Sequence, residues 1–104
     1  MSTRRKSRTV RVLESKVREP LTLGAFLEAI RLGEKLSQAE FARRLGISRS
    51  HLCDIEKGRK VVGAERAVRF ASELGYSQAQ FLQLSLQAML AESGLKFSVT
   101  VRAA

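Results

Sequence analysis

Residues 37–60 read SQAEFARRLGISRSHLCDIEKGRK, and the order of residue types in this stretch decides the fold. Ser37-Gln38-Ala39-Glu40 is a capping box, in which the serine hydroxyl accepts an amide proton and the glutamate reaches back, so it predicts the start of a helix. Gly46 ends this helix, because glycine enters the left-handed conformation at little cost. Ser48 is the N-cap of the next helix, which stops at Gly58. The stretch therefore predicts two short helices joined by a tight glycine turn.

Two helices joined in this way form a helix-turn-helix unit, which places its second helix in the major groove of DNA. The groove is about as wide as one helix, so only side chains on the exposed face of that helix reach the base edges. Leu52 and Ile55 define the buried face. Positions 49, 50, 53, 54 and 57 lie opposite these two residues or flank the exposed side. The pattern therefore indicates DNA recognition by the helix that follows Ser48.

The residues around this unit follow a helical pattern from Leu21 to about Ser93. Apolar spacings of three and four predict one helix before the unit and two after it, five in all. A second capping box, Ser77-x-x-Gln80, starts the last helix, which runs to about Glu92 with Gly94 as its stop. The fourth helix runs from about Ala64 to Leu74. The inward residues are expected to be Leu23, Phe26, Leu27, Ile30, Phe41, Ala42, Leu45, Leu52, Ile55, Ala67, Val68, Ala71 and Leu74.

The charge of the chain points to a polyanionic partner. Its 104 residues carry 19 Lys and Arg against 10 Asp and Glu, a formal net charge of +9. Residues 1–20 hold seven cations against two anions, whereas residues 63–104 hold four against three, so the basic half is N-terminal. Nucleic acid is the first candidate partner, and an anionic membrane or an acidic protein is the second.

Composition also excludes several classes of protein. The single cysteine, Cys53, rules out an internal disulfide and fits a reducing cytoplasm. No apolar run approaches the roughly 20 residues that span a bilayer, and no signal peptide is present, so we expect a cytoplasmic protein with no membrane partner. The sequence shows no catalytic constellation, metal-ligand spacing or phosphate loop, so we expect no enzyme, no cofactor and no metal site. RNA binding fits the charge, but five Phe and one Tyr give a thin stacking surface.

The central stretch resembles the phage repressor, Cro and Xre family of DNA-binding proteins. The residues that carry the resemblance are Ser37-Gln38-x-Glu40-Phe41-Ala42-x-x-Leu45-Gly46-Ile47-Ser48 and Ser50-x-Leu52-x-x-Ile55-Glu56-x-Gly58-Arg59. A looser resemblance extends from Leu23 to Gly75, where Val61-Val62-Gly63 departs from the Pro-Ser or similar cap that usually starts the family's fourth helix. The resemblance implies a double-stranded DNA partner and an all-α fold, a five-helix lambda-repressor-like bundle.

The resemblance also implies roles for individual residues. Arg49, Ser50 and Asp54 occupy the positions whose side chains face base edges. Arg49 suits guanine, and Asp54 either accepts from cytosine N4 or only orients Arg49. The residues expected to contact DNA phosphates are Gln38, Ser48, His51, Lys57, Arg59 and Lys60. For His51, a partly buried packing role is an equal alternative.

Both termini add short strand-like patterns to the helical fold. Residues 1–8 are a basic arm, with or without a role on DNA, and residues 9–13 resemble a strand. Residues 96–102 alternate, with Phe97, Val99 and Val101 on one side, which predicts a half-buried β-strand. The expected domains are 1–20, the arm with its strand; 21–93, the helix-turn-helix DNA-binding domain; and 94–104, a C-terminal strand for dimerisation or partner docking.

The leading functional hypothesis is a repressor that binds an inverted repeat as a homodimer. The alternative is an antitoxin that neutralises a toxin protein and represses its own operon, since an edge strand can extend a partner's sheet. The last helix carries two apolar arcs, which indicates either a dimer partner or cover by the chain's own C-terminal strand. The terminal strands are expected to pair with each other, within one chain or, as we favour, between two copies.

Deletion of residues 1–8 tests the basic arm. The deletion removes Arg4, Arg5, Lys6 and Arg8, so DNA binding should weaken and its dependence on salt should fall. The slope of log affinity against log salt should drop by at most about 3.6, at roughly 0.9 for each phosphate neutralised. An unchanged slope in fluorescence-anisotropy titrations would show that the arm makes no contact with DNA.

Overall fold

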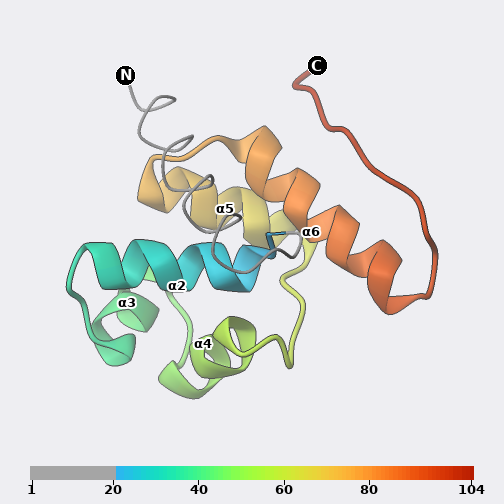
Figure 1. Cartoon of the computed structure of the whole chain (residues 1–104). Coiled ribbons are helices and arrows are strands. Elements are labelled where there is room, and N and C mark those ends of the chain that lie inside the picture. Colours follow the sequence, from blue (N-terminus) through green and yellow to red (C-terminus); the bar gives the residue numbers. More distant parts are fainter. Residues whose placement is uncertain (1–20) are drawn as a thin grey trace.

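The structure, a computed structural model, describes residues 21–104 and contains five helices in this part of the chain (Figure 1). They are α2 (Leu23–Gly33), α3 (Gln38–Leu45), α4 (Arg49–Glu56), α5 (Ala64–Leu74) and α6 (Gln78–Glu92). The expected five-helix all-α bundle is confirmed, with α3 and α4 as the helix-turn-helix unit. The basic arm and the strand expected at residues 9–13 lie outside the described residues.

The helices begin and end at the capping residues that the sequence provides. Ser37 Oγ accepts from the Glu40 amide at 3.1 Å, and Glu40 Oε1 accepts from the Ser37 amide at 2.9 Å, so the capping box of α3 is complete. Ser48 caps α4 through the same kind of bond. Gly46, with φ of 74°, ends α3 in the left-handed conformation. The start of α5 at Gly63 has no side-chain cap, as expected from the departure at Val61-Val62-Gly63.

The core takes one phenylalanine from each of four helices and two aliphatic side chains from α4. The largest fully buried apolar side chains are Phe26 and Leu27 of α2, Phe41 of α3, Phe70 of α5, Phe81 of α6, and Leu52 and Ile55 of α4. Tyr76, in the turn between α5 and α6, joins two of these rings, with ring centroids 5.5–5.8 Å apart. Every helix is therefore attached to the same core, and α4 turns its opposite side to solvent.

Several positions differ from the expected core. Phe70 is fully buried although the apolar pattern did not include it, and Val68 is only half-buried. The buried line of α5 runs through Ala67, Phe70, Ala71 and Leu74, at the i, i+3, i+4, i+7 spacing, and Val68 lies beside it. Ser85 of α6 is also buried, and its hydroxyl is satisfied because it donates to the Val62 carbonyl at 2.7 Å.

Helices α2 and α4 approach each other closely at Gly24. A Cβ at this position would overlap the carbonyl oxygen of Ile55 and lie 3.0 Å from its carbonyl carbon. Backbone cannot move aside as a flexible side chain can, so only glycine fits without a shift of one helix. Gly24 therefore sets the distance between α2 and the C-terminal end of α4.

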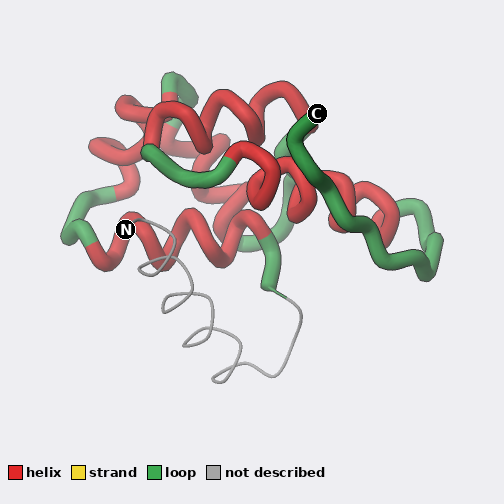
Figure 2. Tube along the Cα trace, turned by 90° about the horizontal axis from the view of Figure 1, so that it is seen from above, coloured by secondary structure: helices red, strands yellow, loops and turns green. Residues whose placement is uncertain are grey.

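The structure shows no β-strand at residues 96–102, where the sequence predicted one. Among residues 21–104 the structure has no strand, and residues 95–104, here called the C-terminal tail, run alongside α6 (Figure 2). End residues of the tail form a pocket with Val68, Ala79 and Leu82. Helix α6 thus lies between the bundle and the chain's own C-terminal residues, which accounts for part of its second apolar arc.

Two glutamine side chains of α6 hold the C-terminal tail. Gln87 donates through Nε2 to the Phe97 carbonyl at 2.6 Å and accepts through Oε1 from the Val99 amide at 2.9 Å. Gln83 Oε1 accepts from the Val101 amide at 2.9 Å. A side-chain amide carries the same donor and acceptor as a peptide group. These glutamines therefore take the place of the neighbouring strand that a β-ladder requires.

Substitution Gly24→Ala tests the close approach of α2 and α4. The added methyl group must push α4 away from α2, so the free energy of unfolding should fall by about 1–3 kcal/mol. The matched control is Gly33→Ala at the end of the same helix, where a Cβ meets nothing within 4 Å. The control should leave stability unchanged or raise it by about 0.5–1 kcal/mol, because alanine favours the helix. Equal effects of the two substitutions in urea unfolding would contradict the assignment.

Candidate nucleic-acid interface

Helix α4 presents the predicted base-reading residues on its solvent side. Leu52 and Ile55 are buried at 0% and 1% exposure. Arg49 and Ser50 in its first turn are exposed, while Asp54 is half-buried. Ser48 stands just before them, and its hydroxyl accepts from the His51 amide at 3.0 Å. The cap fixes the start of the helix and leaves the first-turn side chains free of the core.

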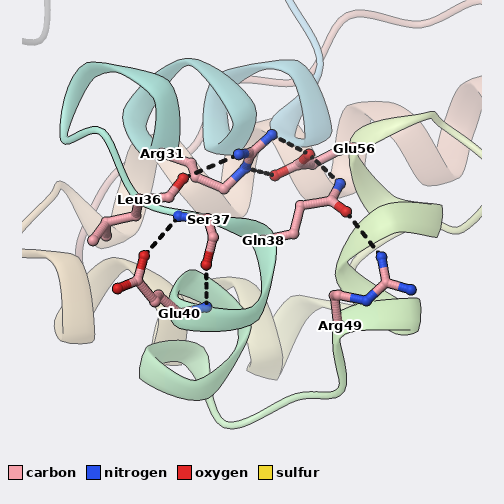
Figure 3. Close-up of polar contacts among 7 residues, drawn as sticks. All are labelled: Arg31, Leu36, Ser37, Gln38, Glu40, Arg49 and Glu56. Atoms are coloured by element: carbon pink, nitrogen blue, oxygen red, sulfur yellow. Dashed lines mark hydrogen bonds and ion pairs between the residues drawn. The ribbon is translucent and has the colours of Figure 1, made fainter.

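A buried ion pair joins α2 to the end of α4 (Figure 3). Arg31 Nε donates to Glu56 Oε2 at 2.8 Å, and Arg31 Nη2 donates to Glu56 Oε1 at 3.1 Å. The side chains are 12% and 1% exposed, and Arg31 Nη1 also donates to the Leu36 carbonyl at 3.1 Å. The hydrogen bond to Glu56 raises the pKa of Arg31 above its ordinary value, against the effect of burial. The bidentate geometry satisfies both charges away from water.

Gln38 connects this ion pair to Arg49. Its Nε2 donates to Glu56 Oε1 at 3.0 Å, and its Oε1 accepts from Arg49 Nη1 at 3.4 Å. Figure 3 shows the resulting chain of contacts from Arg31 through Glu56 and Gln38 to Arg49. Two residues to which the sequence assigned separate roles, a phosphate contact and a base contact, are thus brought together.

Asp54 and Arg59 form a second ion pair at the other end of α4. Arg59 Nε donates to Asp54 Oδ1 at 2.9 Å, with the side chains 59% and 27% exposed. This bond to Asp54 raises the pKa of Arg59. The Asp54 carbonyl accepts from the amides of Arg59 and Lys60 at 2.8 and 3.3 Å, which fixes the loop after α4. Asp54 contacts Arg59 rather than Arg49, the partner that the sequence offered as an alternative.

His51 lies beside an arginine that the sequence analysis missed. Its Nε2 is 3.4 Å from Nη1 of Arg66, which comes from α5. Burial lowers the pKa of His51, and the positive charges of Arg66 and Lys60 lower it further. The imidazole is therefore held in its neutral form in the free protein. Lys57 and Lys60 are exposed nearby, so the region around the end of α4 is rich in cations.

Arg31 is the other residue of the site that sequence reasoning missed. The sequence gives only a weak indication of the pair that Arg31 forms. Arg31 directly follows the buried Ile30, and Glu56 directly follows the buried Ile55. Opposite charges therefore stand at the edges of two apolar helix faces. The two positions are 25 residues apart. No local pattern indicates which edges meet.

The described residues contain neither a metal-binding cluster nor a membrane-spanning helix. In residues 21–104 no group of three or more His, Cys, Asp or Glu side chains could hold a metal ion. Over the same range, no helix has the length and apolar character needed to cross a membrane. What this part of the chain does present is an exposed helix end with arginine and serine side chains, flanked by lysines and arginines.

An exposed second helix in a helix-turn-helix unit defines the class of DNA-binding proteins that read a groove with one helix. The model of a family described as "Helix-turn-helix domain" matches residues 22–84, more than half of the chain. The chain therefore belongs to this helix-turn-helix domain family and is a helix-turn-helix DNA-binding protein. No curated protein and no solved structure matches it.

Substitution Arg31→Met tests the buried ion pair. It leaves the Glu56 carboxylate buried without its cation, so the free energy of unfolding should fall by about 3–5 kcal/mol. The double variant Arg31→Met/Glu56→Leu removes both charges and should regain at least about half of that loss, because no buried charge is left unpaired. Urea unfolding monitored by circular dichroism gives both values. A loss below about 1 kcal/mol for the single variant would mean that water screens the pair.

Proposed function

We propose that the protein is a sequence-specific transcriptional regulator that binds double-stranded DNA in the cytoplasm. Helix α4 enters the major groove, and Arg49, Ser50 and Asp54 are its base-reading residues. The protein binds an inverted repeat as a homodimer and acts as a repressor, since a protein bound across a promoter blocks access to it. The antitoxin alternative requires a toxin partner and stays a prediction.

The observation that carries this proposal is the attachment of Arg49 to Gln38 and, through it, to the buried Arg31–Glu56 pair. Arginine has a large side-chain entropy, and a guanidinium that is already oriented loses less of it on binding. Arginine in the first turn of a groove-entering helix is suited to the bidentate contact with guanine O6 and N7. Gln38 in this view positions Arg49 before DNA is bound.

The phosphate contacts follow from the groups around α4. Lys57 and Lys60 are exposed, and Arg59 is 59% exposed although it is paired with Asp54. Ser48 stands at the helix start, where backbone amides favour an anion. The lowered pKa of His51 favours the neutral imidazole, which binds a phosphate by donating its one ring N–H or by gaining a proton as the anion approaches. Arg66 beside it adds a further cation from α5.

A two-fold arrangement would raise specificity. One eight-residue helix reads only a few base pairs, and a dimer doubles the number of bases read. Half-sites about one helical turn apart would place two copies of α4 in successive major grooves.

Arg49→Ala is the experiment that tests the proposed function. The variant should lose base preference at one position in each half-site, at a cost of roughly 1–3 kcal/mol on the preferred site. The preferred site is first obtained by selection from random duplex DNA, and affinities are then measured on this site and on single-base variants.

The matched control is Arg43→Ala. Arg43 is an exposed cation on α3, so its removal changes the net charge equally and should leave base preference unaltered. If Arg49→Ala weakens binding to the selected site and to random DNA by the same factor, Arg49 is a phosphate contact and not a base reader. If selection yields no preferred sequence, the protein is not a sequence-specific regulator.

A further inference from the structure

The C-terminal tail presents one unpaired strand edge. Three of its residues make backbone hydrogen bonds to α6, and they alternate along the tail: Phe97, Val99 and Val101. In an extended chain the N–H and C=O groups of successive residues point to opposite sides. The backbone groups that face away from α6 are therefore those of Ser98, Thr100 and Arg102. In residues 21–104 these groups have no hydrogen-bond partner, and all three residues are exposed.

The glutamines hold the tail at the spacing of a strand. Gln83 and Gln87 are four residues apart on α6, a rise of about 6 Å. The amides that they bind, of Val99 and Val101, are two residues apart, which is about 7 Å in an extended chain. The two spacings agree, so α6 fixes the tail in the conformation that a pairing strand needs. The free edge is thereby ordered before any partner arrives.

We propose that this edge pairs with the same edge of a second copy, as an antiparallel two-stranded ribbon centred on Thr100. The proposal rests on the homodimer of the proposed function and names the surface through which it forms. The even-numbered residues carry the free backbone groups, so even residues must lie opposite even residues, and the proposed register places Thr100 opposite the partner's Thr100. Ser98 then lies opposite the partner's Arg102, and Val99 opposite the partner's Val101.

The side chains of the tail fit a second copy. Pairing in this register joins the β-branched Val99 to the partner's Val101, a cross-strand contact that stabilises a ribbon. The cations of the two tails do not lie opposite each other in this register, since Arg102 lies opposite the partner's Ser98 and Lys96 lies opposite the partner's Ala104. A two-stranded ribbon alone is marginal in water, but here each strand is backed by its own α6.

The distribution of charge also favours a second copy on this face. Helix α6 has one charged residue, Glu92, among its 15 residues. Each copy has a formal net charge of +9. Two such chains repel each other least where few charges meet. The tail adds Lys96 and Arg102, and in the proposed register neither lies opposite a cation of the partner. The cations of the candidate nucleic-acid interface lie on α4 and the loop after it, which leaves them free for DNA.

Single-cysteine cross-linking tests the pairing and its register. In a full-length Cys53→Ser background, Thr100→Cys places two thiols at a directly opposed pair, with Cα atoms about 5.5 Å apart, within reach of a disulfide. In the matched control Ser98→Cys, the two thiols lie four residues apart along the ribbon, roughly 14 Å. In a glutathione redox buffer, Thr100→Cys should give a disulfide-linked dimer and Ser98→Cys should not.

A second pair of variants tests the free N–H without a covalent bond. Thr100→Pro removes the central outward donor and keeps the bonds of Val99 and Val101 to α6. The dissociation constant of its dimer, measured by sedimentation equilibrium, should rise at least about tenfold, because the partner's carbonyl is left without a donor. Thr100→Ala retains the N–H and should dimerise like the unmodified chain. Circular dichroism spectra of both variants should match, since the tail lies outside the core.

Each contrary result overturns a defined part of the argument. A dimer linked through Ser98→Cys but not through Thr100→Cys overturns the register and with it the proposal. A wild-type dimer that neither cysteine links, and that Thr100→Pro leaves intact, shows that another surface joins the copies, while the proposed DNA function stands. A selection that yields no preferred sequence overturns the proposed DNA function and leaves the pairing standing, because cross-linking is measured without DNA.

Discussion

The buried ion pair of Arg31 and Glu56 is the interaction on which both the bundle and the candidate DNA-binding surface depend. It joins the end of α2 to the end of α4, holds the Leu36 carbonyl of the intervening loop, and through Gln38 reaches α3. Gly24 fixes the same end of α4 against α2 about two helical turns away. With both contacts in place, α4 has one orientation. The solvent face of α4 is thereby fixed relative to the core.

Buried ion pairs add little net stability, because removing two charges from water costs about as much as their attraction returns. Their geometric requirement is strict, however, since each hydrogen bond of the guanidinium must find its acceptor. Here Arg31 uses three nitrogens on Glu56 and the Leu36 carbonyl. The pair therefore acts mainly to select one arrangement of α2, α3 and α4 over neighbouring ones. Leucines alone would tolerate small rotations of α4 that would displace Arg49.

Local signals in the sequence were sufficient for the helices and insufficient for their contacts. The signals that start and end a helix lie within one or two turns of each other, so the helix limits followed from residue types. These signals are Ser37 with Glu40, Gly46, Ser48 and the apolar pattern from Ala64 to Leu74. The contacts of Arg31 and Arg66 join residues 25 and 15 positions apart, and no local rule pairs them. The same limit explains the tail: alternation indicated an extended chain correctly, but it does not specify what the backbone binds. Glutamine amides, spaced by a helix, took the role that a second strand was expected to fill.

The two ends of the molecule are held by different kinds of chemistry. The end that carries the candidate nucleic-acid interface relies on formal charges: Arg59 is paired with Asp54, and exposed lysines follow α4. The C-terminal tail is held by neutral amides of Gln83 and Gln87, which carry no net charge and do not titrate. Mobile ions weaken the first kind of contact and leave the second nearly unaffected. Rising ionic strength would therefore release the nucleic acid while the tail stays docked, so the protein can leave its site without losing the order of its own C-terminal segment.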